Sequence, residues 1–165
     1  MPELRAFGLK SIKLGVVETF ASPAILGVTY KDTATLSQAD DEVVEIMSEE
    51  NADPEEILST PGRKSLNWSI IDVAPDTAVQ VLGGTVTTVD LKDTWNAPAA
   101  GTTIEKSVII ETQNGIIIKI ARAKITAKIN FEFRKLGVLR IDITAVPLTP
   151  ATEGLSSISI TEPAA

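Results

Sequence analysis

The stretch RAKITAKINFEF, residues 122–133, alternates apolar and polar side chains from end to end. Successive side chains of a β-strand point to opposite faces, so this period of two predicts a half-buried strand. The polar face carries two lysines and an arginine, and the apolar face should lie against a core. The residues expected on that inner face are Ala123, Ile125, Ala127, Ile129, Phe131 and Phe133.

Both neighbouring segments predict hairpins. Residues 134–137, Arg-Lys-Leu-Gly, predict a turn, and a second alternating run from Leu139 to Ala145 predicts an antiparallel partner strand. Pro147 ends this partner because proline has no backbone N–H for a central ladder. Upstream, Asn114-Gly115 supplies the positive φ angles of a tight turn between strands expected at residues 104–112 and 116–120.

The rest of the chain predicts further strands and one short helix. The strands are expected at residues 10–17, 28–37, 42–47, 64–71 and 85–91. Pro75 suits a helix start and Gly83 a left-handed stop, which predicts a helix over residues 75–82. A helix of this length is unstable alone and must pack on a sheet. The predicted fold is therefore mainly β, an antiparallel sandwich or barrel with one short flanking helix.

Length and composition favour one domain with an aliphatic core. The 165 residues are 44% hydrophobic but only 4% aromatic. We expect a single β domain over residues 1–150, with an acidic loop inserted at residues 39–62 and a second loop at residues 93–101. Residues 151–165, rich in Ala, Thr, Ser and Pro, predict a flexible C-terminal tail. The N-terminal sequence MPELR has no apolar run, so we expect the protein to fold in a cytoplasm.

The chain offers few groups for chemistry. It contains no cysteine and no histidine. This absence excludes disulfides, thiolate chemistry and the commonest general base and transition-metal ligand. The Gly-Arg-Lys-Ser segment at residues 62–65 lacks the spacing of a phosphate-binding loop. The sequence therefore predicts no catalytic residue, no cofactor site and no metal site, and a function other than an enzyme's.

Charge is divided unevenly along the chain. Residues 40–56 carry nine acidic side chains and no basic one, so with a net charge of −7 the rest of the chain is at +2. The acidic residues are Asp40, Asp41, Glu42, Glu45, Glu49, Glu50, Asp53, Glu55 and Glu56. Between residues 119 and 140 seven basic residues face one acid, and these are Lys119, Arg122, Lys124, Lys128, Arg134, Lys135 and Arg140.

Two interpretations of this charge pattern remain open. Complementary potentials steer association and fix its register, so the acidic loop and the basic residues could attract copies of the chain head to tail. The alternative is a solvated acidic loop beside an ordinary basic strand face. The pI of about 4.6 and the lack of aromatic residues on the basic face argue against tight nucleic-acid binding.

Several segments also follow one another in a recognisable order. They are an early hairpin at residues 28–47, a Gly-Arg-Lys strand at 62–72, a helix ending in Gly83-Gly84, the Trp-Asn-Ala-Pro loop at 95–98, a strand with Asn114-Gly115, and a closing hairpin with INFEF at 129–133 and ITAVPL at 143–148. This order resembles that of the major tail tube proteins of long-tailed bacteriophages. The resemblance covers roughly residues 28–150 and rests on element order, with no single diagnostic motif.

The resemblance implies a structural role. Subunits of that family form hexameric rings stacked head to tail into a hollow tube, bounded by other tail proteins, through which DNA passes as cargo. The expected location is the virion tail, assembled in the host bacterial cytoplasm, with no membrane and no cofactor. Tubes of contractile tails, tailocins and type VI secretion machines are similar, so the sequence does not separate these settings. The family offers no catalytic residues to transfer.

What would transfer is a set of surfaces. The acidic loop would bridge subunits, and the basic residues would face a neighbouring subunit or the lumen. We expect the lumen to be neutral or acidic, with Arg122, Lys124 and Lys128 neutralised by neighbouring acids or turned toward another subunit, since a positive lining would hold DNA. The alternatives are a monomeric β-sandwich module that binds a glycan or cell surface, and a different structural protein of a virion or secretion system.

Overall fold

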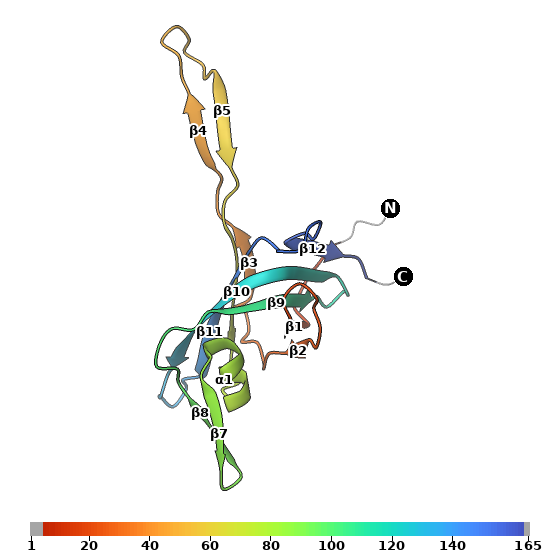
Figure 1. Cartoon of the computed structure of the whole chain (residues 1–165), viewed down its shortest axis with the longest axis vertical. Coiled ribbons are helices and arrows are strands. Elements are labelled where there is room, and N and C mark those ends of the chain that lie inside the picture. Colours follow the sequence, from red (N-terminus) through yellow and green to blue (C-terminus); the bar gives the residue numbers. More distant parts are fainter. Residues whose placement is uncertain (1–4, 164–165) are drawn as a thin grey trace.

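The computed structural model describes residues 5–163, which are mainly antiparallel β with one short helix, as the sequence predicts (Figure 1). In chain order the elements are β1 (Ser11–Gly15), β2 (Ala24–Ile25), β3 (Thr35–Gln38), β4 (Glu42–Ile46), β5 (Glu56–Thr60), β6 (Lys64–Ile70), α1 (Pro75–Leu82), β7 (Thr85–Val89), β8 (Lys92–Asn96), β9 (Ile104–Glu111), β10 (Ile117–Phe131), β11 (Leu139–Pro147) and β12 (Ile158–Thr161).

One eight-stranded sheet forms the body. Its order is β2-β1-β9-β10-β11-β6-β3, with β12 paired to β10. The strands expected at residues 116–120 and 122–133 are one strand, β10, with a bulge between Ile120 and Ala123. β9 pairs with one edge of β10, while β12 covers the first half of the other edge and β11 covers the second half. β10 therefore joins the two halves of the sheet.

The core lies between the inward faces of these strands, which gives a sandwich-like body. Ile120, Ala123 and Ala145 have no exposed surface, and Trp68 is buried beside them. The helix starts at Pro75 and is followed by Gly83 at φ 75°, as predicted. Its buried side chains include Val81, which belongs to the same core cluster. The short helix is thus held by the sheet, as its length requires.

Three expected loops or tails contain strands. Residues 39–62 are not an irregular loop, because β4 and β5 pair as an antiparallel hairpin. β4 was predicted and β5 was not. Residues 93–101 begin in β8, which pairs with β7. Within the expected flexible tail, β12 pairs with β10 from Ile117 to Ile120. In contrast, of the strand expected at residues 28–37 only residues 35–37 belong to a ladder, as part of β3, and Thr29 forms an isolated bridge with Ile70.

The chain leading to β12 is also attached to the body. The carboxylate of Glu18 accepts hydrogen bonds from the Thr152 hydroxyl, at 2.6 Å, and from the Ala151 N–H. The Ala121 N–H donates to Ser157 O at 3.0 Å. These contacts explain why the C-terminal segment follows the sheet, and they correct the expected tail for residues 151–163; residues 164 and 165 lie outside the described part.

The β4–β5 hairpin projects from one end of the body, and the β7–β8 hairpin projects from the other (Figure 1). We call residues 42–60 the arm. It continues the β3–β6 ladder, interrupted at a neck made of residues 39–41 and 61–63. There the Ala39 N–H donates to Arg63 O at 2.9 Å, and the Gly62 N–H donates to a carboxylate oxygen of Asp41 at 3.1 Å. A Cβ on Gly62 would lie 1.9 Å from Ala39 O, so the two segments of the neck can approach this closely only with glycine at position 62.

Candidate interaction surfaces

The arm has no hydrophobic core of its own. Facing residues of an antiparallel pair point to the same side. Val44 therefore shares a face with Leu58, and Glu45 shares the opposite face with Ile57. Six large apolar side chains of this region are 44–58% exposed, and these are Val43, Val44, Ile46, Met47, Ile57 and Leu58. The arm thus presents apolar groups on both sides with nothing packed over them.

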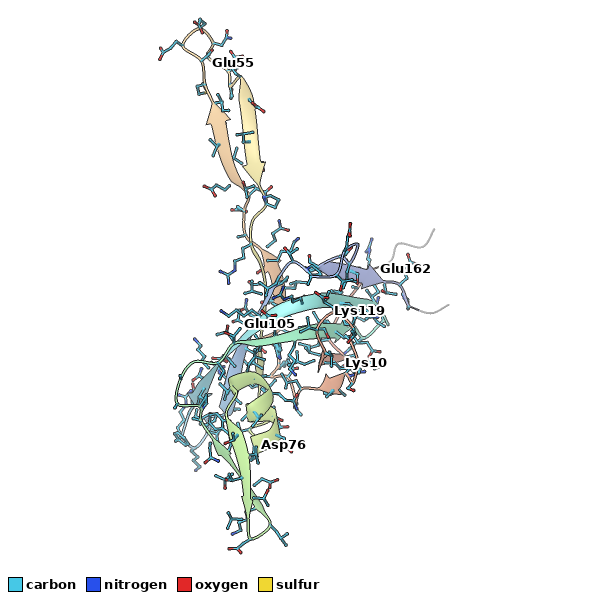
Figure 2. All side chains as sticks on the ribbon, in the orientation of Figure 1. Lys10, Glu55, Asp76, Glu105, Lys119 and Glu162 are labelled. Atoms are coloured by element: carbon cyan, nitrogen blue, oxygen red, sulfur yellow. The ribbon has the colours of Figure 1, made fainter. Side chains whose placement is uncertain are left out.

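The structure brings all nine predicted acidic residues onto the arm and its neck. Asp40 and Asp41 lie in the neck, the strands carry three more, and the turn at the far end carries the remaining four. Every one of the nine is exposed. Glu55 marks the far end of the arm in Figure 2. The acidic half of the charge pattern is therefore one continuous projection.

Glu55 has a structural role within this acidic turn. Its carboxylate accepts hydrogen bonds from Asn51 Nδ2 at 2.6 Å and Ser48 Oγ at 2.9 Å. These two bonds lower the pKa of Glu55 below its ordinary value, and the bond from Asn51 has the larger effect. Its backbone N–H also donates to Ile46 O at 2.8 Å. Glu55 thus holds the turn, while the other acids of the turn face solvent.

The seven basic residues do not form a single surface. Four lie along β10, Arg134 and Lys135 lie in the turn after it, and Arg140 lies on β11. Lys119 stands over the ring of Phe20, at 5.4 Å from its centroid. The Arg140 guanidinium stands 5.9 Å from the ring centroid of Tyr30, and its Nε lies 3.5 Å from an oxygen of Asp142. The sequence could not separate these environments.

Acids on neighbouring strands neutralise much of the basic face of β10. Arg122 makes a two-pronged pair with Glu105, at 2.8 and 3.0 Å, which confirms the expectation for this residue. The hydrogen bond from Arg122 lowers the pKa of Glu105. Lys124 lies opposite Glu105 in the β9–β10 register, and Lys128 lies opposite Asp142 in the β10–β11 register.

A polar network crosses the outer face of the sheet behind these pairs. The Asp142 carboxylate accepts hydrogen bonds from Ser69 Oγ at 2.5 Å and from Asn130 Nδ2 at 3.1 Å. Partial burial by itself would raise the pKa of Asp142, but these two bonds, together with the charges of Arg140 and Lys128, lower the pKa below its ordinary value. Nearby, the Thr144 hydroxyl donates to Asn67 Oδ1 at 2.8 Å. Ser69, Asn130 and Asp142 thus satisfy one another, whereas the buried Nε of nearby Arg140 makes no hydrogen bond within the described residues.

The turn between β10 and β11 exposes two large apolar groups, one of which, Phe133, was predicted to lie in the core. We call residues 132–138 the basic turn. Phe133 was expected on the inner face, but β10 ends at Phe131 and the Phe133 side chain is 86% exposed. Leu136 is 92% exposed. Two large apolar residues flanking Arg-Lys in a turn were the available signal, since a turn offers them no core to enter.

The β7–β8 hairpin ends in a second exposed apolar tip. Its two turn residues, Asp90 and Leu91, have φ angles of 51° and 61°, and Leu91 is 99% exposed. Positive φ is uncommon for a residue with a Cβ, so this turn carries strain that glycine would avoid. The Trp95 indole N–H anchors the hairpin base by donating to Gly83 O at 2.8 Å.

An open groove of about 850 Å³ lies beside β1 and residues 28–36. Its walls are mainly apolar, and Tyr30 is the aromatic residue among its lining side chains.

Within residues 5–163, no group of three or more acidic side chains is placed to hold a metal ion. In the same range α1 is the one helix present, and it is too short to cross a membrane.

Comparisons with known proteins add no relative. No protein-family model matches the chain, and a search of curated proteins found no match.

Proposed function

We propose that this chain is a structural subunit that assembles with copies of itself through the arm, forming stacked hexameric rings of a hollow tail tube through which phage DNA passes. The observation that carries the proposal is the arm: a projecting two-stranded hairpin with exposed apolar residues on both faces and no second layer. A hairpin of two strands is marginally stable alone in water. A partner that covers it would complete the arm.

The energetics favour a covered arm. Burying apolar surface stabilises by about 25 cal/mol per Å², and six half-exposed side chains offer a substantial area. The outer edges of β4 and β5 also carry unpaired backbone groups, since neither strand belongs to the main sheet. A partner that supplies both apolar contacts and hydrogen bonds to a strand edge would therefore gain binding free energy on either side of the arm.

A second copy of the chain is the partner that the charges favour. The acidic segment repels itself, and the rest of the chain, at +2, attracts it. The arm leaves one end of the body, so its receptor is a different surface from the arm itself (Figure 1). Such a head-to-tail interface closes into a ring or extends into a filament. Both products occur in a stacked tube.

DNA enters the proposal as cargo. The net charge of −7 per subunit would make a ring repel the phosphate backbone as a whole, although this negative charge lies on residues 40–56 and the rest of the chain is at +2. The Arg122–Glu105 pair and the Asp142 network reduce the positive potential of the β10 face, which is the main basic surface. Neither tryptophan supports the glycan-binding alternative, because Trp68 is buried and the Trp95 indole donates its N–H to Gly83 O.

The test is assembly of the full chain with and without its arm. Negative-stain microscopy and sedimentation of concentrated protein should reveal rings or filaments. A variant with residues 42–60 replaced by Asn-Gly should remain monomeric while keeping the circular dichroism of the body. A Leu91→Ser variant serves as the control, since it alters an exposed apolar residue outside the arm. A wild-type chain that stays monomeric, or an armless chain that assembles normally, would overturn the proposal.

A further inference from the structure

We infer that the basic turn, residues 132–138, is the docking site for the arm of a second copy. This inference rests on the proposed function and names the receptor that it leaves open. The end of the body away from the arm carries two projecting turns, the one between β10 and β11 and the one between β7 and β8 (Figures 1 and 2). Both expose large apolar side chains, so the choice between them is decided by charge and by the way the apolar groups are presented.

The apolar groups of the basic turn suit one face of the arm. Phe133 and Leu136 are 86% and 92% exposed, and the Phe133 ring is steadied by an edge-to-face contact with Phe131 at 6.2 Å between centroids. The Gly137 N–H donates to Arg134 O at 2.9 Å, which closes the turn behind these side chains. On the arm, Val44, Ile46 and Leu58 share one face and form a short apolar strip.

Charge separates the two candidate receptors. The basic turn carries Arg134 and Lys135 against Glu132, a net charge of +1. The β7–β8 tip carries Asp90 and Asp93 against Lys92, a net charge of −1. On the arm, Glu42 and Glu56 flank the apolar strip on its own face. An acidic and apolar surface therefore matches the basic and apolar turn, and it is repelled by the acidic tip.

The contact has to form between copies. The arm and the basic turn lie at opposite ends of the body, so an arm cannot fold back onto its own turn (Figure 1). Each copy then donates an arm at one end and accepts one at the other. Arg134 already pairs with Glu132 at 2.8 Å in an exposed setting, so a second carboxylate from the arm can join this pair without a change of fold.

The absence of native cysteine makes a direct cross-linking test possible. A Leu58→Cys/Leu136→Cys variant should yield a ladder of multimers on a non-reducing gel after mild oxidation. The matched control is Leu58→Cys/Leu91→Cys, which places the second thiol on the other exposed leucine at the same end, and on the same gel it should run as a monomer without cross-links. Microscopy of the reduced proteins checks that both assemble.

The outcomes separate the two proposals. If the reduced proteins fail to assemble and the wild-type chain fails too, the proposed function falls. If they assemble but only the Leu91 pair cross-links, or neither pair does, the docking site is wrong and self-assembly stands. A ladder with the Leu136 pair alone supports the inference.

A charge exchange provides a second, independent test. Arg134→Glu/Lys135→Glu should raise the concentration needed for assembly about tenfold, because two attractive pairs become repulsive. Adding Glu42→Lys/Glu56→Lys should restore assembly toward the wild-type concentration. Lys92→Glu at the other turn is the control and should change little. Failure of the exchange to restore assembly would overturn the pairing.

Discussion

β10 and the arm are built from the same local chemistry and end in different environments. Both are antiparallel pairs of strands that contain several aliphatic residues, although only β10 alternates them regularly with polar ones. In β10, Ile120 and Ile125 are 0% and 3% exposed, whereas in the arm Val44 and Leu58 are 53% and 50% exposed. The difference is the second layer of the sandwich, which covers β10 and is missing from the arm. Strand pairing therefore forms without a second layer, and an uncovered apolar pair of strands marks a surface that another molecule can cover.

The largest test of this comparison is a matched pair of Ile→Ala substitutions. Ile143 is 1% exposed, so Ile143→Ala should lower the free energy of unfolding by about 2–5 kcal/mol. Ile57 is 58% exposed, and Ile57→Ala should change it by less than about 0.5 kcal/mol in the isolated subunit. Urea unfolding at low protein concentration measures both. Equal losses would mean that the arm is already packed in the free subunit.

Charge reversal on the arm should break assembly while leaving the fold intact. Glu49→Lys/Glu50→Lys/Glu56→Lys should raise the concentration needed for assembly about tenfold or more, with unfolding changed by at most about 0.5 kcal/mol. Glu55 is left in place because it holds the turn through Ser48 and Asn51. Sedimentation velocity gives the measurement, and Glu153→Lys, on an exposed residue outside the arm, is the control. Normal assembly of the triple variant would contradict the role of the arm charges.

The Asp142 network should make the body sensitive to acid. A lowered pKa in the folded state means that the ionised carboxylate stabilises the fold above its ordinary pKa of 3.8, and that this stability is lost as the pH falls through the folded-state value. Asp142→Asn should cost about 1 kcal/mol at pH 7, since the charged acceptor of two hydrogen bonds is removed. Thermal melts of both proteins should converge below pH 3.8. A difference in melting temperature between the two proteins that stays constant at all pH values would contradict this interpretation.

The smallest effect is expected at the β7–β8 tip. Leu91→Gly relieves a positive φ angle in an Asp-Gly turn, so it should stabilise the subunit by about 0.5–1 kcal/mol. Thermal unfolding measures the gain, and Leu91→Ala, which removes the exposed side chain but keeps the Cβ, is the control. A destabilised glycine variant would show that the exposed leucine has a partner within the subunit.

The sequence predicted the elements whose pattern and end signals agree. β11 and the helix combine periodicity with Pro147, or with Pro75 and Gly83, at their ends, and the structure confirms them. The alternating run from Arg122 is also a strand, but it is continuous with the strand expected before it and ends at Phe131. β5 was missed because Ile57 and Leu58 are adjacent and the residues around them are acidic or small, which leaves no alternation to read. Its strand form depends on pairing with β4, and β8 and β12 likewise depend on their partners.

Of the two candidate surfaces, the sequence located the acidic arm but not the basic turn. The acidic side chains are neighbours in the chain, so composition alone located the arm. The basic residues are distributed on β10 and β11, where acids from distant segments, such as Glu105 beside Arg122, cancel some of them. Alternation also continued through Phe133, and periodicity cannot say where pairing with another strand stops. The basic turn therefore emerged only from the fold.

The neck gives the molecule a mechanical character. Between two hydrogen-bonded ladders, the whole connection narrows to two chain segments, with Pro61 removing one backbone donor and a single main-chain bond, from Ala39 to Arg63, described across it. Stiffness falls steeply with cross-section, so a load applied to the arm would flex this joint before it deformed the sandwich. A stack of such subunits would consist of rigid bodies joined by flexible necks, and it would bend at the necks without unfolding any body.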